Sequence, residues 1–130
     1  MPAAVFVQKA TKLFARSPVK ELRVTKAVWN DIVELFGSEH LGRLETLDLS
    51  ERKFNDALAV RLAASDSAHK LKRVRLRNCG LGAQAAAELA DVATVWPLAE
   101  LDVSLNPIPE KALGTLRDRF GKSVVRFDPS

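Results

Sequence analysis

The chain has 130 residues, of which 47% are hydrophobic and 28% are charged, and its formal net charge at pH 7 is +4. This composition excludes an intrinsically disordered chain, and a single cysteine excludes an internal disulfide. No apolar run approaches the roughly 20 residues of a membrane helix, and the N-terminus lacks the basic lead and apolar core of a signal peptide. We therefore expect one globular, cytoplasmic domain with no membrane association.

The first predicted element is an amphipathic helix over residues 3–16, which has an apolar face and a basic face. Ser17 and Pro18 end this helix, because the residue before a proline disfavours the helical conformation. We interpret residues 1–18 as an N-terminal helical cap. The alternative is that they are the helical half of a repeat cut from a longer array.

A six-residue pattern then recurs along the chain, with aliphatic residues at its first, fourth and sixth positions. Four copies and one degenerate copy are present, at residues 19–24, 44–49, 71–76, 98–103 and 122–127. Successive copies start 25, 27, 27 and 24 residues apart. The alternation of aliphatic and polar residues predicts a short strand with one buried and one exposed face.

Apolar residues with helical spacing follow each of the first four copies. The predicted buried positions are Ile32, Val33, Leu35 and Phe36, then Leu58, Leu62 and Ala63, then Ala86, Leu89, Ala90 and Ala93, then Leu113, Leu116 and Phe120. We expect Gly37 and Gly121 to end the first and last of these helices, and Asn55 or Asp56 to cap the second. The alternation of strands and helices predicts an α/β fold, with a parallel sheet on one side and helices on the other.

The third and fourth copies extend into longer motifs, LKRVRLRNCGL at residues 71–81 and LAELDVSLNPI at residues 98–108. Both match the pattern L-x-x-L-x-L-x-x-N/C-x-L, so the chain resembles the leucine-rich-repeat family, with a period nearest to the helix-bearing, ribonuclease-inhibitor-like repeats. The ninth position is Ala27 and Arg52 in the first two copies, which depart from the motif. The resemblance implies a short right-handed solenoid, with the parallel sheet on the concave face and the helices on the convex face.

The same resemblance implies a single domain over residues 1–130. Its repeats would be residues 19–43, 44–70, 71–97 and 98–121, followed by a C-terminal strand and tail at residues 122–130. The last strand would be a free sheet edge unless something covers it.

The fifth positions of the copies form the centre column of the predicted sheet face. Their charges alternate in sign: Arg23, Asp48, Arg75, Asp102 and Arg126. Neighbouring strands lie about 4.8 Å apart, so adjacent members of this column attract each other. One interpretation is a self-neutralising ladder of ion pairs that keeps the strands in register. The other is a charged recognition stripe that pairs with a partner.

The third copy departs from this balance because basic residues crowd its strand: Lys70, Lys72, Arg73, Arg75 and Arg77. We expect the three arginines to project outward at alternate positions, where they would suit an acidic protein surface or the phosphates of a nucleic acid. Asp48 and Asp102 flank the cluster, and no outward strand position is aromatic. Both observations disfavour nucleic acid as the partner.

Residue types that often carry chemistry have structural interpretations in this chain. Cys79 is predicted to be a small buried residue, and Asn106, at the same position of the next copy, is predicted to satisfy backbone groups of a turn. With one cysteine and no pair of histidines at metal-ligand spacing, the sequence predicts no metal site and no cofactor. Nothing in the pattern supports acid–base catalysis, so we do not expect an enzyme.

We therefore expect a non-catalytic module that recognises another protein. The predicted partner-binding residues are Arg23, Asp48, Arg73, Arg75, Arg77 and Asp102. A five-strand face of about 400 Å² is smaller than the roughly 800 Å² that a standard interface buries on each partner. This leaves open a structural subunit, or a fragment of a longer solenoid, that docks or oligomerises through its ends. Nucleic-acid backbone binding through the basic cluster is a more distant alternative. The high alanine and arginine content suggests a bacterial source.

Overall fold

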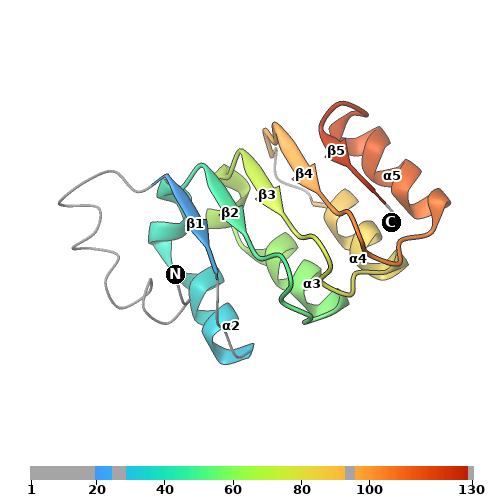
Figure 1. The fold of residues 1–130 in the computed structure, drawn as a ribbon. Helices are drawn as coiled ribbons and strands as arrows, with labels where there is room; N and C mark the ends of the chain where they lie inside the picture. Colours follow the sequence, from blue (N-terminus) through green and yellow to red (C-terminus); the bar gives the residue numbers. More distant parts are fainter. Residues whose placement is uncertain (1–19, 25–28, 93–95, 129–130) are drawn as a thin grey trace.

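The computed structural model describes residues 20–24, 29–92 and 96–128. Within them, five strands form one parallel sheet in chain order: β1 (Glu21–Arg23), β2 (Thr46–Asp48), β3 (Arg73–Arg75), β4 (Glu100–Asp102) and β5 (Val125–Arg126). The α-helices of the described part cover one face of this sheet (Figure 1): α2 (Trp29–Gly37), α3 (Asp56–Ala64), α4 (Ala83–Ala90) and α5 (Glu110–Phe120). The predicted α/β fold with a parallel sheet is thus confirmed. The helix predicted at residues 3–16, the motif position Ala27 and the predicted helix position Ala93 lie outside the described residues.

In the strands, residues that face the helices alternate with residues that face away from them, and this alternation defines the two faces of the sheet. Their buried residues stand side by side in the register: Leu22, Leu47, Val74, Leu101 and Val125. Among the described residues, the first and sixth positions of the first four copies are buried as well, including Leu44, Leu49, Leu71 and Leu76, whereas in the degenerate fifth copy Lys122 is exposed and Phe127 is half-buried. Because side chains alternate along a strand, the residues on either side of the buried ones face away from the helices. The predicted core positions of the strands are therefore confirmed.

Each helix turns its larger apolar residues to the core. The predicted positions that are buried are Ile32, Leu35, Phe36, Leu58, Leu62, Ala86, Leu89, Leu113 and Leu116. The predicted positions Val33, Ala63, Ala90 and Phe120 are only half-buried, because they lie at the margins of the apolar faces of their helices.

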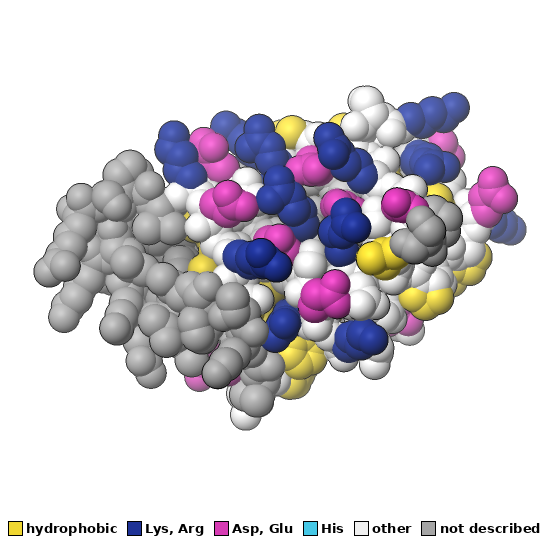
Figure 2. All heavy atoms as spheres, viewed as in Figure 1, with side chains coloured by type: hydrophobic (Ala, Val, Ile, Leu, Met, Phe, Trp, Pro, Cys, Tyr) yellow, Lys and Arg dark blue, Asp and Glu magenta, His cyan; other side chains and the backbone are white. Residues whose placement is uncertain are grey.

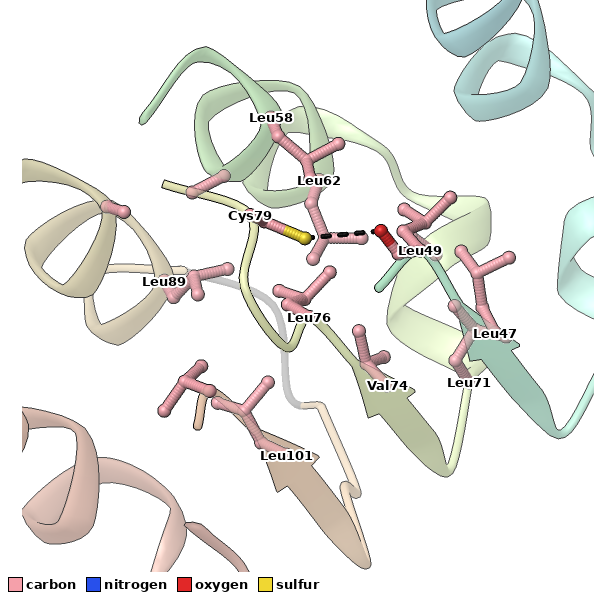
Figure 3. Packing of buried hydrophobic residues seen from close by; sticks show 14 of the residues in the cluster. Leu47, Leu49, Leu58, Leu62, Leu71, Val74, Leu76, Cys79, Leu89 and Leu101 are labelled. Atoms are coloured by element: carbon pink, nitrogen blue, oxygen red, sulfur yellow. Dashed lines mark hydrogen bonds between the residues drawn. The ribbon is translucent and has the colours of Figure 1, made fainter. Parts of the chain in front are cut away.

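In the third and fourth copies, the ninth position lies in the turn that follows the strand, and its side chain bonds to nearby backbone groups. The Cys79 thiol donates to the Leu49 carbonyl at 3.2 Å (Figure 3). The Asn106 amide donates to the carbonyls of Leu76 at 2.7 Å and Val103 at 2.9 Å. Both residues are buried, as predicted, and both connect one strand–helix unit to the preceding one.

The N-terminus of α4 is capped by a residue of the preceding helix. The Asp56 carboxylate accepts hydrogen bonds from the backbone N–H groups of Gly82 at 2.7 Å and Ala85 at 3.2 Å. Asn55, the residue before α3, makes no side-chain capping bond within the described part of the chain. The prediction that Asn55 or Asp56 caps α3 is therefore wrong. Asp56 caps α4 because Gly82 supplies no side-chain acceptor of its own.

Two short 3₁₀ helices, which the sequence pattern did not predict, return the chain to the sheet. They are η1 (Glu39–Arg43) before β2 and η2 (Ser67–Lys70) before β3. The buried Ser65 hydroxyl donates to the Phe36 carbonyl at 2.7 Å and accepts from the Ala68 N–H at 3.3 Å. One serine thus fixes the start of η2 against the end of α2.

Trp96 occupies the corresponding return before β4. Its indole N–H donates to the Leu71 carbonyl at 3.0 Å, and its ring packs on those of His69 and Phe120, with centroid separations of 4.9 and 5.9 Å. The predicted packing role of Trp96 is confirmed, and the ring joins three consecutive strand–helix units.

The end of α5 and the strand after it have the predicted order. Gly121 follows α5 with φ of 103°, a conformation that favours glycine, and Gly37 is the last residue of α2. Beyond Gly121, β5 pairs only with β4 and forms an edge of the described sheet. Backbone bonds from Val103 and Leu105 to the carbonyls of residues 126 and 128 extend this pairing past β5.

Candidate functional site

The face of the sheet that the helices leave uncovered is dense in charge. Figure 2 shows Lys and Arg side chains intermingled with Asp and Glu over this face. We call it the open face and define it by these residues: Glu21, Arg23, Thr46, Asp48, Arg73, Arg75, Arg77, Glu100, Asp102 and Arg126. Every residue predicted from the sequence to bind a partner lies on it.

The centre column has the predicted register. Arg23 pairs with Asp48, Asp48 with Arg75, Arg75 with Asp102, and Asp102 with Arg126 as neighbours in the parallel ladder. Charges of opposite sign therefore alternate across all five strands.

The ion pairs of Arg75 do not follow that column. The Arg75 guanidinium contacts Glu21 Oε1 at 3.2 Å and Glu100 Oε2 at 3.5 Å, and neither acid belongs to the column. Both glutamates stand at the third position of their copies, one row before Arg75. β2 lies between β1 and β3, so the Arg75 side chain spans β2 to reach Glu21. The predicted ladder between fifth-position neighbours is therefore wrong at Arg75, because an arginine is long enough to reach acids in the adjacent row.

Two further arginines repeat this diagonal arrangement. Arg126 Nε lies 3.2 Å from Glu100 Oε1, and Arg77 Nη1 lies 3.5 Å from Asp102 Oδ2. Glu100 thus contacts two arginines, and only 13% of its side chain is exposed. The four residues Glu21, Arg75, Glu100 and Arg126 form a network that crosses the whole sheet, which we call the diagonal network.

The two aspartates of the column serve mainly to end their strands. Asp48 Oδ1 accepts the Ser50 N–H at 2.9 Å, and Asp102 Oδ1 accepts the Ser104 N–H at 3.0 Å. An aspartate that bonds to the backbone two residues later forms a local turn. Asp102 is only 6% exposed and also pairs with Arg77, so little of its side chain is accessible to a partner.

A signal for these turns is present in the sequence. Asp-Leu-Ser at residues 48–50 and Asp-Val-Ser at residues 102–104 share the Asp-x-Ser spacing. Each serine hydroxyl then accepts an N–H from the next unit along: Ser50 from Arg77 at 3.1 Å, and Ser104 from Asp128 at 2.9 Å. These bonds connect the turn after one strand to the backbone that follows the next strand.

The remaining predicted residues differ in exposure and pairing. Asp48 and Arg75 are half-buried, whereas Arg23, Arg73 and Arg77 are exposed. Lys72, next to Arg73, pairs with Glu45 at 3.7 Å. Within the described residues, no carboxylate lies within ion-pair distance of Arg73.

Cys79 is not placed for nucleophilic chemistry. Its side chain is buried, and this burial raises the pKa of the thiol from 9.0 to about 12. The nucleophilic thiolate is therefore suppressed at neutral pH. Among residues 20–24, 29–92 and 96–128, no group of three or more His, Cys, Asp or Glu side chains is arranged to hold a metal ion.

The opposite side of the molecule carries shallow grooves between neighbouring helices. One groove, of about 270 Å³, lies between α4 and α5 and is lined mainly by Ala83, Ala87, Pro109, Ala112 and Thr115. Another, of about 350 Å³, lies beside α3 and is lined by Trp29, Val60 and Arg61 among others. Neither groove takes a lining residue from the open face.

No protein-family model and no curated protein matches this sequence. In the part of the chain that the structure describes, none of the helices has the length and apolar character needed to cross a membrane.

Proposed function

We propose that this chain is a short leucine-rich-repeat solenoid whose function is the non-catalytic recognition of another protein through the open face. The repeat assignment is supported by the strand–helix units stacked in chain order and by Cys79 and Asn106, which bond between units at the position where the motif requires Asn or Cys. Their recurrence at one motif position is the behaviour expected of a repeat array.

The diagonal network is the observation that supports recognition most directly. Its ion pairs restrain long charged side chains on the surface in the absence of a partner. Side chains that are already ordered lose less conformational entropy on binding, so more of the interaction energy appears as affinity. Fixed charges of both signs also discriminate between partners, because a wrongly placed like charge is penalised.

The test is a pull-down with tagged protein from a lysate of the source organism, with and without nuclease. The variant carries Arg73→Glu, Arg75→Glu and Arg77→Glu together. A matched control carries Lys53→Glu, Arg61→Glu and Lys111→Glu, which change the charge equally at exposed positions outside the strands. Circular dichroism establishes that both variants are folded.

We expect a protein partner that survives nuclease, binds the control, and is lost with the open-face variant. A partner that binds both variants as it binds wild type would contradict recognition through the open face. A partner that disappears with nuclease would instead indicate nucleic acid.

Assembly through the end of the sheet is a second candidate, and the pairing of β5 favours it. The carbonyls of residues 124, 126 and 128 accept bonds from β4 and the residues after it. Alternate residues of a parallel strand direct their backbone groups to opposite sides, so the Phe127 N–H faces away from β4. Light scattering across protein concentrations tests this candidate: association that Phe127→Pro abolishes would support it, and a monomer at all concentrations would exclude self-assembly.

A further inference from the structure

Arg73 differs from the arginines that follow it along the chain on the open face. Arg75, Arg77 and Arg126 each have a carboxylate oxygen within 3.5 Å. Arg73 is exposed on the central strand, and among the described residues it has no ion pair. The Arg73 guanidinium, which carries five N–H donors, is therefore exposed to solvent on the central strand of the open face.

The neighbours of Arg73 explain why it has no internal partner among the described residues. In the register it stands between Thr46, which is uncharged, and Glu100. Glu100 would be its natural acid, but Arg75 and Arg126 already bind both oxygens of that carboxylate. On the other side of Arg73 in the chain, the charge of Lys72 is matched by Glu45.

The surrounding ion pairs also balance in charge. The diagonal network holds two acids and two arginines, and the pairs Arg77–Asp102 and Lys72–Glu45 are each neutral. Arg73 therefore adds an uncompensated positive charge to an otherwise neutral part of the face. A carboxylate is the group that a guanidinium binds most specifically, through two parallel hydrogen bonds.

We propose that Arg73 receives an acidic side chain of the partner protein, and that this contact sets the position of the partner on the open face. The proposal rests on the proposed recognition function. A nucleic acid fits less well, because its closely spaced phosphates would meet Glu100 beside Arg73 and Glu45 beside Lys72.

The test uses the intact chain labelled with ¹⁵N and follows the arginine side-chain Nε–Hε signals by NMR. The probes are a glycine–glutamate peptide, a glycine–lysine peptide of equal length, and a short oligothymidine. Arg73→Gln removes the charge at the site. Arg61→Gln is the matched control, since Arg61 is exposed on α3.

We expect the acidic peptide alone to shift the Arg73 signal in a saturable way. Arg73→Gln should weaken that binding about tenfold, and Arg61→Gln should leave it unchanged. Equal binding by wild type and Arg73→Gln would overturn the proposal, as would tighter binding of the oligothymidine at Arg73.

The acidic contact at Arg73 and the proposed recognition function can fail separately. If the cellular partner is lost with the triple arginine variant but retained by Arg73→Gln, recognition through the open face stands and the acidic contact at Arg73 falls. If the acidic peptide binds at Arg73 while no partner depends on the open face, the site stands and the proposed function falls.

Discussion

The side chain of Asn106 holds the backbone on both sides of Cys79, although the two residues belong to different strand–helix units. Its Oδ1 atom accepts the Cys79 N–H at 2.8 Å and the Leu81 N–H at 3.1 Å. Its amide nitrogen donates to the carbonyls of Leu76 and Val103. It also donates to the Ser104 carbonyl at 3.2 Å. One buried side chain therefore bonds to five backbone groups that lie outside the strands and helices.

Asn106→Ala should destabilise the protein by about 3 kcal/mol or more, because several buried backbone groups lose a partner at once. Unfolding in urea, followed by circular dichroism, measures this loss. Asn30→Ala is the control, since Asn30 is exposed on α2, and its effect should stay within about 0.5 kcal/mol. Similar losses in the two variants would contradict the role assigned to Asn106.

Removing the Asp56 carboxylate should uncap α4 while leaving α3 in place. We expect Asp56→Ala to cost about 1–2 kcal/mol, since it deprives the Gly82 and Ala85 N–H groups of their acceptor. Hydrogen exchange should accelerate at the first turn of α4 in this variant. Asp118→Ala, at an exposed site on α5, should change neither quantity. Faster exchange confined to α3 would show that Asp56 caps its own helix instead.

Two glycine substitutions should have effects of opposite sign. Gly80 has φ of +76°, and a Cβ atom there would collide with the Asn55 carboxamide, so Gly80→Ala should cost about 2 kcal/mol or more. Gly114 lies within α5, and a Cβ atom added there would have no neighbouring atom of the described residues within 4 Å. Gly114→Ala should therefore stabilise by about 0.5–1 kcal/mol. The midpoints of thermal unfolding of the two variants should move in opposite directions from that of wild type.

The buried thiol of Cys79 should make stability fall at alkaline pH. Its pKa is raised from 9.0 to about 12 in the folded chain, so the unfolded chain releases this proton first. The contribution is complete below pH 9 and is lost as the pH rises towards 12. At pH 10, wild type should have lost about 1.4 kcal/mol more than Cys79→Ala, relative to pH 7.5. Urea unfolding of both proteins across this range tests the difference, and parallel curves would rule it out.

Replacing His69 should stabilise or destabilise the protein according to the shape of the new side chain. Both ring nitrogens of His69 are buried without a hydrogen-bond partner among the described residues, whereas the ring packs on Trp96. His69→Phe keeps the ring contact and removes the unsatisfied polar atoms, so it should stabilise by about 1 kcal/mol. His69→Ala should instead cost about 2–3 kcal/mol, because it leaves a cavity beside Trp96. A loss of stability in both variants, measured by urea unfolding, would indicate that the imidazole nitrogens contribute to folding.

The repeated hydrophobic pattern was sufficient to predict the strands, most of the buried helix positions and the register of the centre column. These features depend on residues that are close in sequence and on a nearly constant repeat length, which places equivalent residues of successive units side by side. The pattern also predicted the burial of Cys79 and the backbone bonding of Asn106, which both reach the carbonyl at the end of the preceding strand's copy.

The features that the sequence did not predict arise between units. Asp56 stands at the start of α3, where local rules favour capping of that helix, and its true acceptor role depends on how α4 packs beside it. The ion pairs of Arg75 depend on how far a flexible side chain reaches over the sheet. The backbone bond of Asp102 could have been anticipated from its Asp-x-Ser spacing.

The ion pair between Arg75 and Glu21 affects the order in which the strands detach during unfolding. In a stacked array whose units touch only their neighbours, unfolding starts at an end and proceeds one unit at a time. An ion pair that joins β1 directly to β3 opposes this fraying, because detaching the first strand also breaks a contact of the third. The pair is exposed, so its contribution is at most about 1 kcal/mol and is weakened by salt. Low ionic strength should therefore favour concerted opening of the first three strands, and high ionic strength should favour release of the first strand alone.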